Sequence, residues 1–287
     1  MIIDSHAHYA HASFSNTFRY LTRDAEGYIL AEGDLEQLLE RMKAAGIACT
    51  IEPGISLASN EGILALSRRC PGYIFPAIGV HPTRTFRERW RDRKRLEALA
   101  ALPEVIAVGE TGLDYHYKRE EQHRFLQHIW FFYQLNLARK VRKPLILHIR
   151  DAHDDALRIL KAHPARHLGG VVHCFTGDWE TAAEYLKLGY HIGIGGALLQ
   201  EKERAEKLWE AVERIPLDRI LLETDAPYVL PDCKDQIKAK QRRRARNSSL
   251  ILPAVAEKIG ALKGISPETV LDTSAKNTIR LFSLPIQ

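Results

Sequence analysis

The sequence predicts an α/β fold of the (β/α)8 type, a TIM-type barrel in which eight parallel strands alternate with helices. Short apolar runs alternate with helix-length amphipathic segments along the chain, and eight such runs can be counted, as this barrel requires. The runs are apolar throughout, as in residues 145–147, which is typical of parallel strands buried on both faces. A chain of 287 residues suits one such barrel, so we expect a single domain over residues 1–287.

The apolar runs and the amphipathic segments give the expected ranges of the strands and the helices. Strands are expected near 2–6, 47–52, 73–80, 104–109, 144–148, 170–174, 190–195 and 218–224. Helices are expected near 34–45, 57–69, 88–101, 119–141, 151–163, 179–188 and 201–214, with a C-terminal helical stretch over about 246–260 and 267–283. Gly46 and Gly189 follow amphipathic segments just before a strand, as residues at helix C-termini do.

Composition narrows the class of protein. The chain is 45% hydrophobic, and no run approaches the roughly 18 apolar residues that a membrane span needs. The N-terminus lacks the charged and apolar regions of a secretory signal. The four cysteines lie far apart without a C-x-x-C pair, which argues against a disulfide framework or a zinc ribbon. We therefore expect a cytoplasmic protein with no membrane contact and no obligate protein partner.

The net charge of +5 indicates little by itself, but basic side chains gather in two runs. The first run consists of Arg84, Arg87, Arg89, Arg91, Arg93, Lys94 and Arg95, and the second of Lys234, Lys238, Lys240, Arg242, Arg243, Arg244 and Arg246. The first is equally consistent with a solvated helix face. The second run contains fewer acidic residues and resembles a basic surface that binds phosphate.

The first expected strand ends in two histidines, His6 and His8, two residues apart. Alternate side chains of a strand share a face, so both imidazoles are expected to point the same way. Two neutral imidazoles suit a borderline metal such as zinc, manganese or iron. For this motif alone, a pair of solvent-exposed histidines near a terminus is the alternative.

Other metal-ligating residue types stand at the same end of further expected strands. Active sites of such barrels lie at the C-terminal ends of the strands. The residues placed there are His6, His8, Glu110, His148, His173 and Asp225. Each alone has another explanation, such as a buried hydrogen-bonded imidazole, a helix cap or a turn former. Their common placement at the ends of five strands favours a metal site.

These six residues can hold two ions. Glu110 is placed to bridge them, because a carboxylate has two oxygens. His6, His8 and Asp225 would complete one site, and His148 and His173 the other. Two ions about 3.5–4 Å apart can lower the pKa of a bridging water and stabilise an in-line displacement at phosphorus. The predicted chemistry is phosphoester hydrolysis with two divalent metal ions; zinc, manganese, magnesium, nickel and iron all remain possible.

Six segments of the chain resemble, in order and spacing, the motifs of the TatD-related deoxyribonucleases. They are residues 3–8, 78–82, 109–115, 148–152, 173–177 and 223–228, and they span nearly the whole chain. The resemblance implies a barrel of the amidohydrolase-like, metal-dependent hydrolase kind. It also implies divalent metals bound by the six residues above, and nuclease activity, often 3′-to-5′ removal of nucleotides from single strands, with single-stranded DNA the favoured substrate.

The chain departs from the family pattern in two places. The family often carries Arg-Asn-Glu-Pro after the eighth strand, whereas this chain has Arg246-Asn247-Ser248-Ser249. The segment from Tyr9 to Gly33 is longer than the usual loop after the two histidines. It would lie on the active face of the barrel, so we expect it to affect substrate preference more than chemistry.

In addition to Glu110, three residues are expected to act on the substrate. Asp225 is expected to be a metal ligand and the general base. His81 is expected to donate to a phosphate oxygen; the alternative is a structural histidine that fixes the turn at Pro82. Arg150 is expected to bind phosphate bidentately; the alternative is an ion pair with Asp114.

Other side chains near the strand ends have two interpretations each. Glu223 either orients a metal-bound imidazole or pairs deeper in the barrel. Tyr9, Tyr115, Tyr117 and Tyr228 either stack on unpaired bases or serve packing.

Three other functions compete with the nuclease. Amide and lactone hydrolases of the amidohydrolase kind often bridge their metals with a carbamylated lysine, but no lysine stands beside Glu110. Ester cleavage on aminoacyl-tRNA would be served equally well by the same ions. A nucleic-acid-binding protein with an inert metal site is disfavoured, because binding alone does not require six such ligands.

Overall fold

The structure is a computed structural model that describes residues 1–286, without the side chains of residues 118–120. Eight parallel strands form one sheet, hydrogen-bonded in the order β1 (Ile2–Asp4), β4 (Ile47–Pro53), β5 (Ile74–Ile78), β6 (Ala107–Asp114), β7 (Leu145–Arg150), β8 (Gly170–Val172), β9 (His191–Ile194) and β10 (Ile220–Leu222). The backbone N–H of Ser5 donates to the carbonyl of Leu222 at 2.9 Å, which brings the chain after β1 against β10 and closes the ring. The predicted barrel is confirmed.

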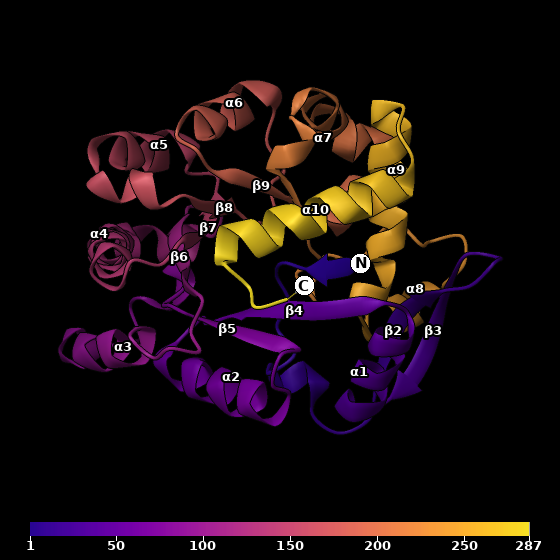
Figure 1. Cartoon of the computed structure of the whole chain (residues 1–287), viewed down its shortest axis with the longest axis horizontal. Helices are drawn as coiled ribbons and strands as arrows, with labels where there is room; N and C mark the ends of the chain where they lie inside the picture. The colour runs from indigo at the N-terminus through magenta and orange to yellow at the C-terminus, as the bar shows by residue number, and fades with distance from the viewer. Residues whose placement is uncertain (287) are drawn as a thin grey trace.

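Helices surround these strands (Figure 1). They are α1 (Leu35–Ala44), α2 (Leu57–Arg69), α3 (Arg93–Ala100), α4 (Arg124–Val141), α5 (His153–Ala162), α6 (Trp179–Lys187), α7 (Lys202–Arg214), α8 (Ala239–Arg242), α9 (Leu252–Lys263) and α10 (Pro267–Phe282). Local signals set several ends: Ser56 caps α2 in a reciprocal pair with Ser59, and Gly46 takes a φ of +81° just after α1, as predicted. Within residues 1–286, no helix combines the length and the apolar character needed to cross a membrane.

Two layers of apolar side chains hold the barrel together. In β7, Ile146 points into the barrel interior with Ile51 and Leu221, whereas Leu145 and Leu147 belong to the cluster packed under the helices. Burial of each such side chain contributes roughly 1.5–3 kcal/mol. Phe282 and Leu284, in and just after α10, pack on the interior cluster, and α10 crosses the front of the barrel in Figure 1. The open mouth of the barrel therefore lies on the opposite face.

A second, three-stranded sheet was not expected from the sequence. It is formed by β2 (Phe18–Arg23), β3 (Tyr28–Gly33) and β11 (Ala245–Arg246), in the order β11-β2-β3. The hairpin of β2 and β3 lies in the long segment from Tyr9 to Gly33. The helix expected near 246–260 begins only at Leu252, because residues 245–246 pair with β2 and Pro253 occupies the first turn of α9.

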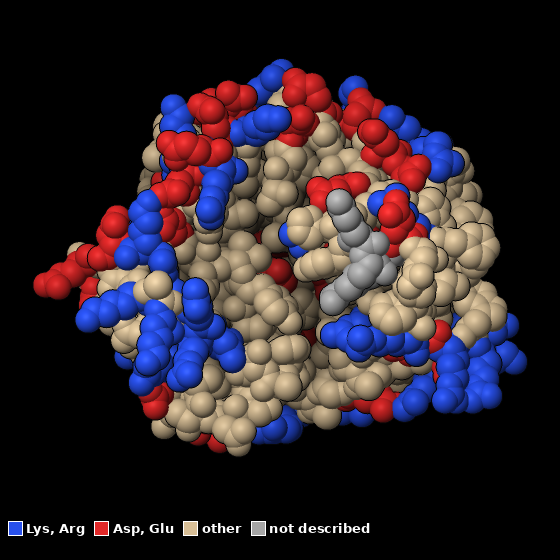
Figure 2. Space-filling model, turned by 180° about the vertical axis from the view of Figure 1, so that it is seen from behind, with Lys and Arg blue, Asp and Glu red and all other residues tan. Residues whose placement is uncertain are grey.

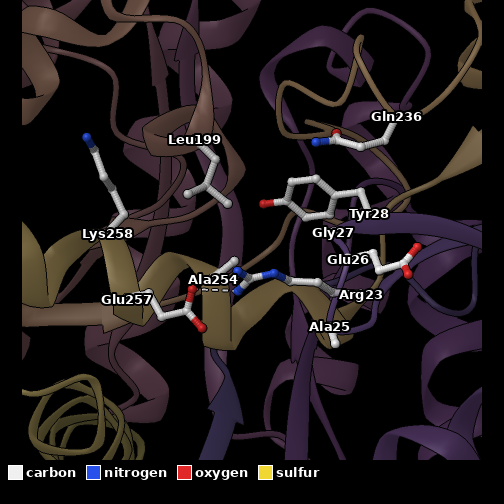
Figure 3. Close-up of a pocket in the computed structure, with 10 residues that line it drawn as sticks. All are labelled: Arg23, Ala25, Glu26, Gly27, Tyr28, Leu199, Gln236, Ala254, Glu257 and Lys258. Atoms are coloured by element: carbon white, nitrogen blue, oxygen red, sulfur yellow. Dashed lines mark hydrogen bonds and ion pairs between the residues drawn. The ribbon is translucent and has the colours of Figure 1, made fainter.

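Two side-chain contacts tie the hairpin to the rest of the fold, one of them from a residue that departs from the family pattern. Ser248, at the position of the family's glutamate, donates from Oγ to the carbonyl of Leu21 at 2.7 Å. On the far side of the hairpin, the Arg23 guanidinium reaches across a pocket of about 530 Å³ to Glu257 on α9, at 2.5 Å (Figure 3). The insertion is therefore anchored both to the segment after β10 and to α9.

Candidate metal centre

All six predicted metal ligands converge at the mouth of the barrel. His6 and His8 follow β1, His173 follows β8 and Asp225 follows β10. Glu110 and His148 lie inside β6 and β7, because these two strands continue to pair as far as Asp114 and Arg150, beyond the ends expected from the sequence. The β6–β7 register is irregular between Val108 and Thr111, where Glu110 lies.

One set of ligands gathers around Asp225. The Nε2 atoms of His6 and His8 are 3.3 Å apart. Asp225 Oδ1 lies 3.7 Å from the first and 3.4 Å from the second. These three atoms lie close enough together to share one cation.

The second set gathers around Glu110 Oε1. His173 Nε2 lies 2.9 Å from this oxygen, and His148 Nδ1 lies 3.6 Å from it. Glu110 also faces the first set, with Oε1 3.5 Å from His6 Nε2 and Oε2 3.6 Å from His8 Nε2. Glu110 therefore stands between the two sets, where a bridging carboxylate would stand.

The charges of this cluster favour a cation. Burial opposes ionisation of Glu110, but the imidazoles of His81, His173 and His6 outweigh burial and hold the pKa of this carboxyl well below its usual range. Burial likewise disfavours a charged His8, yet its contact with Asp225 raises its pKa to about 9. A buried and a partly buried carboxylate, Glu110 and Asp225, thus attract positive charge to the cluster. Imidazole nitrogens with carboxylate oxygens form a donor set that suits divalent transition metals.

Two carboxylates lie behind the cluster, and one of them is hydrogen-bonded to a ligand imidazole. Asp114 Oδ2 lies 3.2 Å from His148 Nε2, which leaves Nδ1 of that ring facing Glu110. Glu223 Oε1 accepts from the backbone N–H of Cys174 and lies 3.7 Å from His173 Nδ1, near the ring but beyond hydrogen-bond distance. A carboxylate in the position of Asp114 fixes the tautomer of a metal-bound histidine.

The role of Asp114 was missed in the sequence, which offers it only as an ion-pair partner of Arg150. A signal was available: Glu110 and Asp114 lie four residues apart on one strand, so their side chains share a face. Two further carboxylates missed in the sequence hold the backbone of the ligands. Asp4 accepts from the N–H of His6 at 3.1 Å and from the Thr224 hydroxyl at 2.6 Å, and so joins β1 to the segment after β10.

Glu52 is the other missed carboxylate. Its two oxygens accept from the backbone N–H groups of Tyr9, at 2.8 Å, and Ala10, at 2.9 Å. The side chain is buried, and it fixes the chain directly after His8.

His81 lies beside the cluster, with its ring centroid 4.1 Å from that of His148. The backbone N–H of Thr83 donates to His81 Nδ1 at 3.1 Å, so a neutral His81 carries its proton on Nε2. Burial and the neighbouring His148 lower the pKa of His81 to about 3. His81 thus holds the turn at Pro82, as one interpretation expected, and it also has an N–H donor remaining.

Arg150 and His81 line the same cavity as the cluster, whose volume is about 530 Å³. The Arg150 guanidinium carbon lies 5.7 Å from the centre of the Tyr117 ring. Figure 2, which shows the face opposite to that of Figure 1, has acidic side chains in a hollow and basic side chains gathered on both sides of it. A polyanion approaching the cluster therefore meets positive charge first.

Comparison with known proteins identifies the family. The family described as TatD related DNase matches residues 3–283. The chain belongs to this family. The resemblance seen in the six motifs is confirmed.

Two relatives and two solved structures illustrate the similarity. The chain is 37% identical to "3'-5' ssDNA/RNA exonuclease TatD" of Erwinia billingiae over 252 residues, covering 88% of this chain and 94% of that protein. It is 32% identical to the "Uncharacterized metal-dependent hydrolase YabD" of Bacillus subtilis over 284 residues, covering 99% and 100%. The crystal structure of YjjV, a TatD homologue from Escherichia coli K12, matches with a TM-score of 0.82 at 28% identity, over 99% of this chain and 98% of that one. A mutant organophosphorus hydrolase from Deinococcus radiodurans shares the fold, with a TM-score of 0.61 at 16% identity over 98% and 92% of the two chains.

Proposed function

We propose that the protein is a divalent-metal-dependent phosphodiesterase that removes nucleotides from single-stranded nucleic acid in the 3′-to-5′ direction, with single-stranded DNA favoured. The observation that carries this proposal is Glu110 lying between two sets of imidazole ligands, at the bottom of a cavity flanked by basic side chains. The 37% identical relative named as a 3'-5' ssDNA/RNA exonuclease supports the choice of substrate.

Two ions would be held by the residues that converge at the mouth. Glu110 would bridge them, with His6, His8 and Asp225 on one ion and His148 and His173 on the other. The bound ions would polarise the phosphoryl oxygens and make the attacking water more acidic.

The protein's own side chains would perform the remaining steps. Burial opposes ionisation of Asp225, but its contact with His8 lowers its pKa, so the carboxylate is available to accept the proton of the attacking water. The Nε2–H of His81 would donate to a non-bridging phosphate oxygen as charge develops there. The Arg150 guanidinium would bind a second oxygen and hold the phosphate in line.

We also propose that the protein is cytoplasmic and forms a single domain. All four cysteines are unpaired thiols, which supports the reducing cytoplasm as the compartment. Helix α10 packs against both β1 and β10, the first and last barrel strands, which supports one domain over residues 1–287.

A cleavage assay across a panel of metals tests the function. End-labelled single-stranded and double-stranded oligonucleotides are incubated with zinc, manganese, magnesium, nickel or iron, and with a chelator as control. The proposal predicts stepwise shortening of single strands from the 3′ end, abolished by the chelator. Absence of cleavage with every metal, together with release of the amino acid from aminoacyl-tRNA, would favour the ester hydrolase instead.

A further inference from the structure

We propose that Tyr228 and Tyr117 each bind one unpaired nucleobase, on the two sides of the phosphodiester that is cleaved. This inference rests on the proposed phosphodiesterase function and adds the feature that selects unpaired substrate.

The two tyrosines stand on opposite sides of the barrel mouth. Tyr117 follows β6 and Tyr228 follows β10, and these strands are four places apart in the ring of eight. Both tyrosines line the cavity that also contains Glu110 and Asp225. A dinucleotide with its phosphate at the cluster would therefore extend one nucleoside toward each ring.

Exposure separates these two tyrosines from the other two expected near the strand ends. Tyr228 is 47% exposed and Tyr117 is 40% exposed. Tyr9 is buried, and its hydroxyl lies 2.7 Å from Ser249 Oγ. The Tyr115 hydroxyl donates to Asp155 at 2.8 Å, which ties this partly buried ring to α5. Tyr9 and Tyr115 thus serve packing, and Tyr117 and Tyr228 present aromatic surface to the cavity.

Each exposed ring shares the cavity with an arginine. The Arg150 guanidinium lies over Tyr117, with its carbon 5.7 Å from the ring centre. Arg84 lines the same cavity as Tyr228. An aromatic ring beside a guanidinium group matches a nucleotide, whose base stacks while its phosphate pairs with the cation.

The ring of Tyr228 is also held in place. Its hydroxyl lies 3.4 Å from His11 Nε2, and its ring centroid is 6.2 Å from that of His8. A base stacked on Tyr228 would be one nucleotide away from a phosphate at the cluster. In a duplex the faces of each base are covered by neighbouring base pairs, so only an unpaired base reaches such a ring without unstacking.

Alanine variants and abasic substrates test the proposal together. The kcat/KM of wild type, Tyr228→Ala and Tyr117→Ala is measured on a single-stranded trinucleotide, on the same compound lacking the base on either side of the cleaved bond, and on methyl p-nitrophenyl phosphate. We expect each alanine variant to lose about tenfold or more on the intact trinucleotide. Loss of one base should cost wild type a similar factor, and the variant lacking the matching tyrosine should be insensitive to that loss.

Controls separate stacking from indirect effects. The phenylalanine variants of both tyrosines should retain most of the wild-type rate, and Phe125→Ala, at a ring 74% exposed on α4 outside the cavity, should be unchanged. Wild-type rates for both alanine variants on the trinucleotide would overturn the proposal, and so would equal losses on methyl p-nitrophenyl phosphate. If wild type cleaves no phosphodiester, the proposed function fails. The stacking proposal is then judged by binding of a 2-aminopurine oligonucleotide, and equal affinities for wild type and both alanine variants would overturn it.

Discussion

Asp114→Asn tests how the protein prepares His148 as a ligand. In the structure Asp114 Oδ1 accepts from the backbone N–H of His116 at 2.9 Å, while Oδ2 lies 3.2 Å from His148 Nε2. An asparagine that keeps its oxygen on the His116 N–H must turn its NH2 group toward His148. The Nε2 atom of His148 would then accept, the ring proton would move to Nδ1, and the nitrogen that faces Glu110 would lose its lone pair.

The expected loss follows from that change of tautomer. Removal of a carboxylate that orients a metal-bound histidine weakens metal binding or activity by about 10-fold to 100-fold, equivalent to about 1.4–2.7 kcal/mol. Calorimetric titration of metal-free protein with zinc or manganese measures the affinity, and kcat at saturating metal measures the activity. The loss should be confined to the site that contains His148, so a two-site titration should show one weakened step.

Asp151→Asn is the matched control. Asp151 is an exposed carboxylate that contacts a histidine, with Oδ2 2.9 Å from His116 Nδ1, but it lies outside the cluster. We expect the metal affinity of the Asp151→Asn variant to equal that of wild type. If Asp114→Asn also binds both ions with wild-type affinity, the assignment of Asp114 as the group that orients His148 is wrong.

Three further predictions concern the chemistry. Asp225→Asn should reduce turnover by about two to four orders of magnitude, the range typical of a lost general base, with an unchanged circular dichroism spectrum, and near-wild-type turnover would remove Asp225 from the base role. Activity on oligonucleotides should fall with added salt more steeply than activity on methyl p-nitrophenyl phosphate, because basic side chains flank the cavity; equal salt dependence would show that they only face solvent. Because the pKa of His81 is lowered to about 3, its ring stays neutral above that pH, so His81→Gln should lower kcat while the profile between about pH 5 and 8 keeps its wild-type shape; loss of an acidic limb would contradict a neutral donor.

The barrel was predictable because its signal is local. Runs such as residues 145–147 are apolar at every position, and they recur at the spacing of a strand and a helix. Strand ends were less accurate: β6 and β7 continue through polar residues such as Glu110, Asp114 and Arg150, which line the mouth. A prediction that ends each strand at its last apolar residue therefore makes the strand too short at the active face, where polar residues continue it.

The third strand of the second sheet could not be predicted, because its pairing is remote in sequence, unlike that of the local β2–β3 hairpin. β11 is two residues long, and its partner β2 lies more than 200 residues earlier in the chain. The same reason applies to Asp4 and Glu52, whose roles depend on Thr224 and on the N–H groups after His8. The six clustered residues could be predicted because parallel strands bring their C-terminal ends to one mouth, whereas no such rule identifies Asp4 and Glu52.

The most direct test of the account is the location of bound ions. Crystals grown with manganese or zinc and measured at the metal absorption edge reveal each ion by its anomalous signal. We predict two peaks about 3.5–4 Å apart, with Glu110 between them, His6, His8 and Asp225 on one, and His148 and His173 on the other. Anomalous signal only at other places on the protein, with these six side chains free of metal, would contradict the metal centre and the hydrolase built on it.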